Sequence, residues 1–168
     1  MKLFHSLSRL TSYKLSIHLN QEYDLQTFAV RHNSRLCLWY IHYYGDEQDQ
    51  FELVRVGHAC VLFTQIGTAG GYGEEQDKEI NLGLFRISLF LNELHSGRNY
   101  SSSVPPQPLL AQSSEDQIEE EGGIEEVEAQ LFNKRQQYGD KIKYCAGRAK
   151  ASTLNNYIKW SSIRPRWV

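Results

Sequence analysis

The hydrophobic pattern of the chain changes its period at a glycine-rich stretch, residues 67–73. Before this stretch, apolar and polar residues alternate from Tyr13 to Leu19, which is the pattern of a strand with one buried face. Four more candidate strands follow, at 26–31, 35–44, 51–56 and 59–66. The connections between them are too short for helical crossovers. We therefore expect an antiparallel sheet of about five strands over residues 12–66.

The pattern after the glycine-rich stretch predicts a helix. Apolar residues there are spaced alternately four and three apart, which places them on one helical face: Ile80, Leu84, Ile87, Leu91 and Leu94. Acidic residues before this series and His95 and Gly97 after it suit the two ends of a helix. We expect a helix from about Asp77 to His95. The predicted fold class is α+β: an antiparallel sheet with a packed helix, followed by a charged helical C-terminal segment.

Charged residues are segregated in the last third of the chain, although the net charge is only −2. Residues 113–129 contain eight acidic and no basic side chains, whereas residues 130–168 contain nine basic side chains and one acidic. Serine and proline dominate the preceding residues, as is typical of linkers. The sequence therefore predicts a core domain at 1–97, a linker at 98–112 and an acidic-then-basic helical tail at 113–168.

Aromatic residues are interleaved with the bases of this tail. Cations contact phosphates and aromatic rings stack on bases, so the composition suits a single-stranded nucleic acid. The candidate nucleic-acid-binding residues are Lys134, Arg135, Lys141, Lys143, Arg148, Lys150, Lys159, Arg164, Arg166, Tyr144, Tyr157 and Trp160. Two alternatives remain open: the acidic segment folds back and neutralises the bases, or both segments are solvated helix faces.

The sequence contains no complete catalytic or metal-binding pattern. The glycine-rich stretch lacks the spacing and the lysine of nucleotide-binding loops. His58 and Cys60, two apart on a candidate strand, would point to one face as a nucleophilic pair or a metal site, with His18 and His42 as further ligands. The alternative is a buried thiol beside a histidine in a turn. The acids around Asp46 lack the ligand pattern of a calcium loop. We expect no catalytic residue, metal or cofactor.

Neither a membrane segment nor a secretion signal is predicted. The chain has no run of eighteen apolar residues, and its N-terminus lacks the unbroken apolar core of a signal peptide. The first 21 residues have the composition of an organelle transit peptide, or else form an amphipathic first helix. Three cysteines at unrelated spacings fit free thiols in a reducing compartment. We expect an intracellular, cytoplasmic protein.

These observations favour a small non-catalytic binding or adaptor protein with a protein partner. Such a protein would serve as an accessory factor of a larger assembly, or of a virus or mobile element. The alternative is a nucleic-acid-binding protein that uses the basic aromatic C-terminal segment. An enzyme with a site around His58, Cys60 and the glycine-rich stretch comes third.

Overall fold

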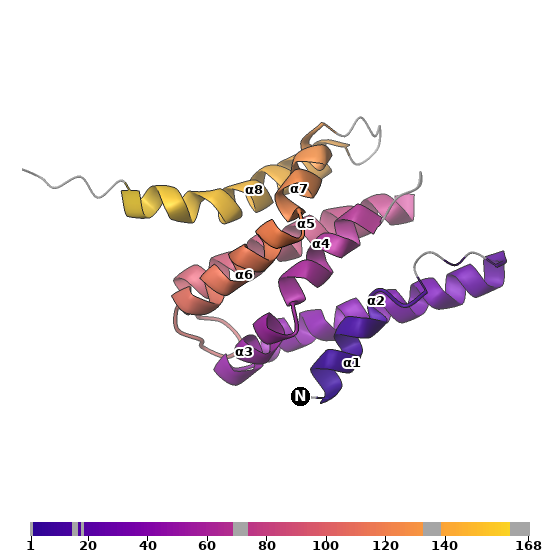
Figure 1. Ribbon diagram of the computed structural model, residues 1–168, viewed down its shortest axis with the longest axis horizontal. Helices are drawn as coiled ribbons and strands as arrows, with labels where there is room; N and C mark the ends of the chain where they lie inside the picture. The colour runs from indigo at the N-terminus through magenta and orange to yellow at the C-terminus, as the bar shows by residue number, and fades with distance from the viewer. Residues whose placement is uncertain (1, 15–16, 18, 69–73, 133–138, 162–168) are drawn as a thin grey trace, which may run out of the picture.

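The chain folds into α-helices (Figure 1). The computed structural model describes residues 2–14, 17, 19–68, 74–132 and 139–161, without the side chains of 68, 74–76 and 155–161. The helices in these residues are α1 (Lys2–Leu10), α2 (Gln21–Tyr44), α3 (Glu47–Arg55), α4 (His58–Thr68), α5 (Glu74–Ser96), α6 (Pro108–Glu120), α7 (Gly123–Leu131) and α8 (Gly139–Ser161). A single antiparallel bridge, between Arg98 and Val104, is the only β-type pairing in this described part.

The predicted α+β fold with its five-stranded sheet is wrong. Of the candidate strands, 26–31 and 35–44 lie in α2, 51–56 covers the second half of α3 and its C-cap, and 59–66 lies in α4. The described residues between Tyr13 and Leu19 belong to no regular element. A short apolar run fits a buried strand and a buried helix equally well. In α4 the apolar residues of the larger hydrophobic cluster recur at helical spacing, at Ala59, Leu62, Phe63 and Ile66.

The helix predicted from about Asp77 to His95 is confirmed as α5. All five apolar residues of its predicted stripe are buried. Helices also occur in the described part of the predicted C-terminal tail, 113–168, which contains the end of α6 together with α7 and α8. The helix α6 begins before residue 113, because Pro108 suits its first turn.

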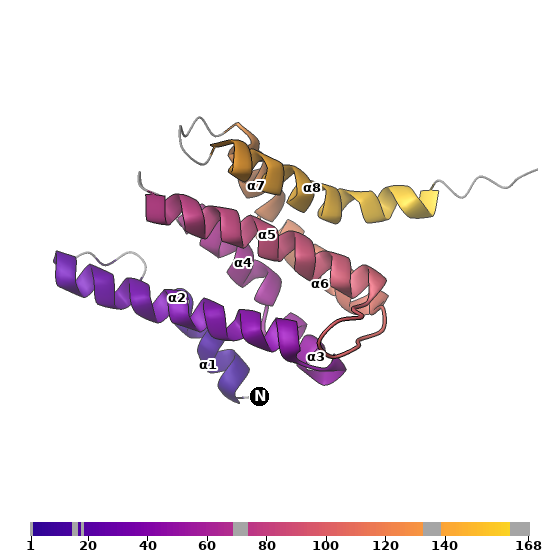
Figure 2. The ribbon, with the colours of Figure 1, turned by 180° about the vertical axis from the view of Figure 1, so that it is seen from behind.

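The helices lie in three tiers, which Figures 1 and 2 show from opposite sides. The lowest tier is α2 with α1 and α3, the middle tier is α5 with α4 and α6, and α7 and α8 form the third. One hydrophobic cluster contains residues from each of the helices α3 to α8. A smaller cluster around Leu38, Leu53 and Val61 contains residues from each of the helices α1 to α4. The division of the chain at residues 98 and 113 stays a prediction, although residues on both sides of it share the larger cluster.

Charged and aromatic side chains of α2 also join the lowest tier to the middle tier. The Nδ1 atom of His32 lies 2.8 Å from the Glu79 carboxylate, and the guanidinium of Arg35 lies 3.6 Å from the same group. The Arg86 guanidinium stacks over the ring of Trp39, 5.2 Å from its centroid. Because buried charges are stable only with partners, these contacts fix how α2 lies against α5.

Candidate binding groove

The buried guanidinium of Arg98 holds the corner between α2 and α3. It donates hydrogen bonds to the carbonyl oxygens of His42 and Gly45, and its Nε donates to the carbonyl of Ser102 at 2.9 Å. The Ser102 hydroxyl donates to the Gly45 carbonyl at 2.7 Å. The Glu93 carboxylate lies 3.6 Å from Arg98 Nη1 and 3.2 Å from His42 Nε2. This network ties the α2–α3 corner to the loop of residues 97–106.

The surroundings of Glu93 favour its ionised form. Burial alone would raise the pKa of this carboxyl, but contact with His42, the Tyr100 hydroxyl and the charge of Arg98 outweigh burial and hold the pKa below its usual value. Burial and the adjacent Glu93 raise the pKa of Tyr100, so its hydroxyl stays a donor. The corner is therefore built around a buried anion with three partners.

Two glycines allow the chain to make this corner. A Cβ atom on Gly45 would lie 2.4 Å from the Ile41 carbonyl oxygen and 2.6 Å from the Asp49 Cβ. Gly97 has a φ of +77°, and a Cβ there would lie 2.8 Å from the Val104 carbonyl oxygen. A larger residue at Gly45 would clash within the α2–α3 corner, and one at Gly97 would clash within the loop of residues 97–106.

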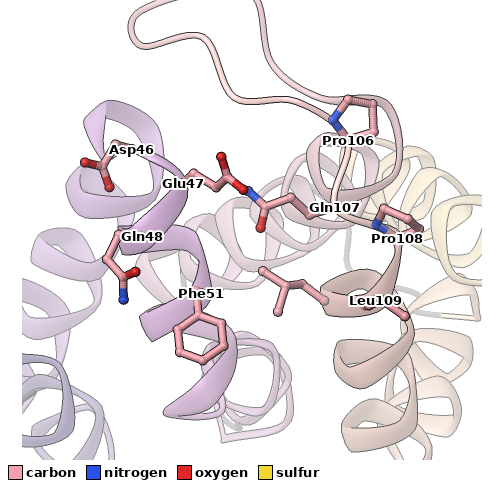
Figure 3. Close-up of a pocket in the computed structure, with 9 residues that line it drawn as sticks. Asp46, Glu47, Gln48, Phe51, Pro106, Gln107, Pro108 and Leu109 are labelled. Atoms are coloured by element: carbon pink, nitrogen blue, oxygen red, sulfur yellow. The ribbon is translucent and has the colours of Figure 1, made fainter.

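A groove of about 870 Å³ lies beside the corner, between the start of α3 and the start of α6 (Figure 3). One wall belongs to α3, whose N-cap Asp46 forms a capping box with Asp49, with N···O distances of 3.0 and 3.1 Å. The other wall is the chain from Pro106 to Leu110. The lining residues are Asp46, Glu47, Gln48, Phe51, Pro106, Gln107, Pro108, Leu109 and Leu110.

The groove combines exposed apolar side chains with carboxylates. Phe51 is 45% exposed and Leu109 is 81% exposed, which is unusual for large apolar residues that lie close together. The lining contains two acidic residues and no basic one. Glu47 and Gln107 point toward one another across the groove in Figure 3. The Gln107 side chain is only 9% exposed, yet its Nε2 finds no acceptor among the described residues.

Sequence reasoning missed the groove, because its walls lie about sixty residues apart and residues 98–112 have the composition of a linker. Two local signals were present. Asp46 and Asp49 have the spacing of a capping box, and Pro108 suits the first position of a helix. Both signals mark helix starts, but neither shows that the two starts meet in space.

The predicted nucleic-acid-binding residues that the structure describes lie on α8. Lys141, Lys143, Tyr144 and Arg148 are exposed, with Tyr144 at 67%. Lys150 is partly buried, and its Nζ lies 2.7 Å from a Glu128 carboxylate oxygen. Tyr157, Lys159 and Trp160 lie on α8 without described side chains, and Lys134, Arg135, Arg164 and Arg166 lie outside the described residues. Nucleic-acid binding by this set stays a prediction.

The predicted placement of His58 and Cys60 on one face of a strand is wrong. Both residues lie in the first turn of α4, and residues two apart on a helix point to different sides. Burial, with the neighbouring His42 and Arg86, lowers the pKa of His58 to about 3. Burial raises the pKa of Cys60, whose Sγ lies 3.8 Å from the Gln117 carbonyl oxygen. A thiol of this kind lacks the thiolate character of a nucleophile.

The other candidate sites of the sequence gain no support as metal or phosphate sites. His18 and residues 69–73 of the glycine-rich stretch lie outside the described residues. Asp46 and Asp49 cap α3. In the described ranges, no group of three or more His, Cys, Asp or Glu side chains is arranged to hold a metal ion.

Two further findings bear on function. No helix in the part of the chain that the structure describes is long and apolar enough to cross a membrane. The chain matches no family model, and no curated protein or solved structure is similar to it. The groove and the exposed side of α8 are therefore the two surfaces of the described chain that we consider for binding.

Proposed function

We propose that this protein is a non-catalytic adaptor that holds a segment of a partner protein in the groove between α3 and α6. The observation that carries the proposal is the contiguous apolar lining formed by Phe51, Leu109 and the two prolines beside it. Apolar residues scattered singly on a surface need no explanation. A concave group of apolar residues, in contrast, marks a place where another molecule binds and covers them. The groove is therefore the surface at which we expect a partner.

The fixed walls of the groove support binding. Arg98 is buried and bonded to the α2–α3 corner, which leads into one wall, and to the loop that leads into the other wall, so the walls are held in place before a partner arrives. A site that is already ordered loses less conformational entropy when it binds. The lining also contains no serine, cysteine, histidine or lysine, so it offers no hydroxyl or thiol nucleophile with a histidine or lysine base beside it.

A photocrosslinking experiment with the full chain tests this proposal. Benzoylphenylalanine replaces Leu109 in one protein and, in the control protein, the exposed Leu25, which lies about 30 Å along α2 from the α2–α3 corner. In extract of the native source, we expect a partner to crosslink at position 109 and not at position 25. The crosslink should disappear when Phe51→Asp is added. Equal crosslinking at both positions, or none at position 109, would contradict the proposal.

A second candidate function is nucleic-acid binding by α8. The observation that favours it is the exposure of Lys143, Tyr144 and Arg148 together on the side of α8 that faces away from the core. Fluorescence anisotropy with a labelled single-stranded oligonucleotide, at several salt concentrations, tests it. The double variant Lys143→Glu/Arg148→Glu should lose at least tenfold in affinity, whereas the control Arg9→Glu on α1 should not. Equal loss in both variants would exclude α8 as the interface.

A further inference from the structure

The acids that line the groove disfavour an anionic ligand. Asp46 and Glu47 are exposed at the start of α3, and Asp49 adds a third carboxylate to the same turn. The amide groups at the helix start offset part of this charge, but the lining contains no lysine or arginine to neutralise the rest. A cationic side chain would be attracted to this wall, and a phosphate or carboxylate would be repelled.

The opposite wall presents hydrogen-bond donors without acceptors. Gln107 Nε2 is buried and has no acceptor among the described residues. The N–H of Leu109 lies in the first turn of α6, where no helix carbonyl can accept from it, and the N-cap residue Gln107 makes no side-chain capping bond. A buried donor left without an acceptor costs stability, so the groove gains from a ligand that supplies one. Because the acids repel anions, that acceptor is a neutral carbonyl oxygen.

A peptide supplies these three features together. Its main chain carries neutral carbonyl acceptors, and its side chains can provide a cation and an apolar group. In an extended segment, neighbouring side chains point to opposite sides. One side chain then reaches the acids of α3, while the next packs on Leu109 of α6, with Phe51 between them (Figure 3).

We propose that the groove binds an extended segment of a partner protein in which an arginine or lysine stands next to a large apolar residue. The cation lies against Asp46 and Glu47, the apolar side chain covers Phe51 and Leu109, and a main-chain carbonyl accepts from Gln107 Nε2. This inference rests on the proposed function, because it specifies what the adaptor groove accepts.

Selection from a random heptapeptide phage library tests the inference on the immobilised full chain. The selected sequences should carry arginine or lysine directly beside leucine, phenylalanine or tryptophan. A fluorescent synthetic copy of the strongest peptide should bind Glu47→Lys at least tenfold more weakly than the unchanged protein. The matched control Glu22→Lys, an exposed acid on α2, should bind it equally well. The peptide with its cation changed to glutamate should show the opposite preference and bind Glu47→Lys more tightly.

The outcomes separate this inference from the proposed function. Selected peptides without basic residues that lose affinity with Leu109→Asp but not with Glu47→Lys would overturn the inference and leave the adaptor groove standing. Selected peptides that bind Leu109→Asp as well as the unchanged protein would overturn both, and so would a selection that enriches nothing. Circular dichroism checks that each variant is folded, and Glu47→Gln serves as a milder second variant, with an expected loss of about threefold.

Discussion

Mild acid should destabilise the protein through His58. This imidazole is only 1% exposed. Its ring centroid lies 5.0 Å from the ring centroid of Phe90 and 6.2 Å from that of His42. Burial, together with His42 and Arg86, lowers its pKa to about 3, whereas an unfolded chain has a histidine pKa of about 6.5. Below pH 6.5 the unfolded chain therefore binds a proton that the folded chain excludes. The free energy of unfolding falls as the pH falls, until the folded protein also takes up the proton near pH 3.

The size of this effect follows from the difference in proton binding. Within the window, the free energy of unfolding falls by up to about 1.4 kcal/mol per pH unit for one histidine. Between pH 7 and pH 5 the integrated loss is about 2 kcal/mol. For a urea dependence of about 2 kcal/mol per molar, that loss lowers the urea midpoint by about 1 M.

Urea unfolding followed by circular dichroism at several pH values between 7 and 5 measures the effect. His58→Gln removes the titrating ring, so the midpoint of this variant should fall by about 1 M less than that of the unchanged protein. His5→Gln removes an exposed ring from α1, which water surrounds in the folded and unfolded chains alike, and should behave as the unchanged protein does. The same pH dependence in His58→Gln as in the unchanged protein would refute the reasoning. So would an NMR titration of the folded protein in which His58 protonates near pH 6.5.

The remaining predictions concern the corner, the core and the thiols. Arg98→Met leaves the Glu93 carboxylate buried without its cation, so the free energy of unfolding in urea should fall by about 3–5 kcal/mol. The double variant with Glu93→Leu should recover part of that loss, and no recovery would mean that the pair is not coupled. Leu84→Ala opens a cavity in the main cluster and should cost about 2–5 kcal/mol, whereas a cost under about 1 kcal/mol would place Leu84 at the surface. Brief alkylation of the folded protein should label the exposed Cys37 before Cys60, whose pKa is raised by burial, and the reverse order would contradict the placement of α4.

The sequence predicted α5 correctly because its apolar residues keep a helical spacing and its other face is mostly polar. The stretch that forms α4 also has buried residues on one helical face, at Ala59, Leu62, Phe63 and Ile66. Apolar or small residues also stand between these buried residues, so the pattern of 59–66 predicts a strand that is covered on both faces. Tertiary contacts on several sides of α4, from α5, α6 and α7, explain why apolar residues surround the helix.

The error over α2 has a different cause. Its buried residues are Thr27, Ser34, Arg35, Leu38 and His42, and four of these five are polar and would be assigned to the surface. Exposed aromatic residues, such as Tyr40 and Tyr44, lie on its outer side and imitate a second apolar face. A pattern based on hydrophobicity cannot identify a helix that packs through ion pairs, because the partners of those ions are known only from the fold.

The charge blocks of the last third of the chain come together in the structure mainly through apolar contacts. Val127 of α7 shares a hydrophobic cluster with Ile142 and Ala146 of α8, while the ion pair between Glu128 and Lys150 lies at the surface. An exposed ion pair of this kind contributes about 0–1 kcal/mol, so burial of the apolar residues accounts for more of the association. The packing leaves Arg148 exposed in the third tier, whereas the acids that line the groove lie at the start of α3 in the lowest tier (Figure 1). We therefore expect that a basic peptide in the groove does not displace a polyanion from α8. Direct competition between the two ligands would mean that they share one surface.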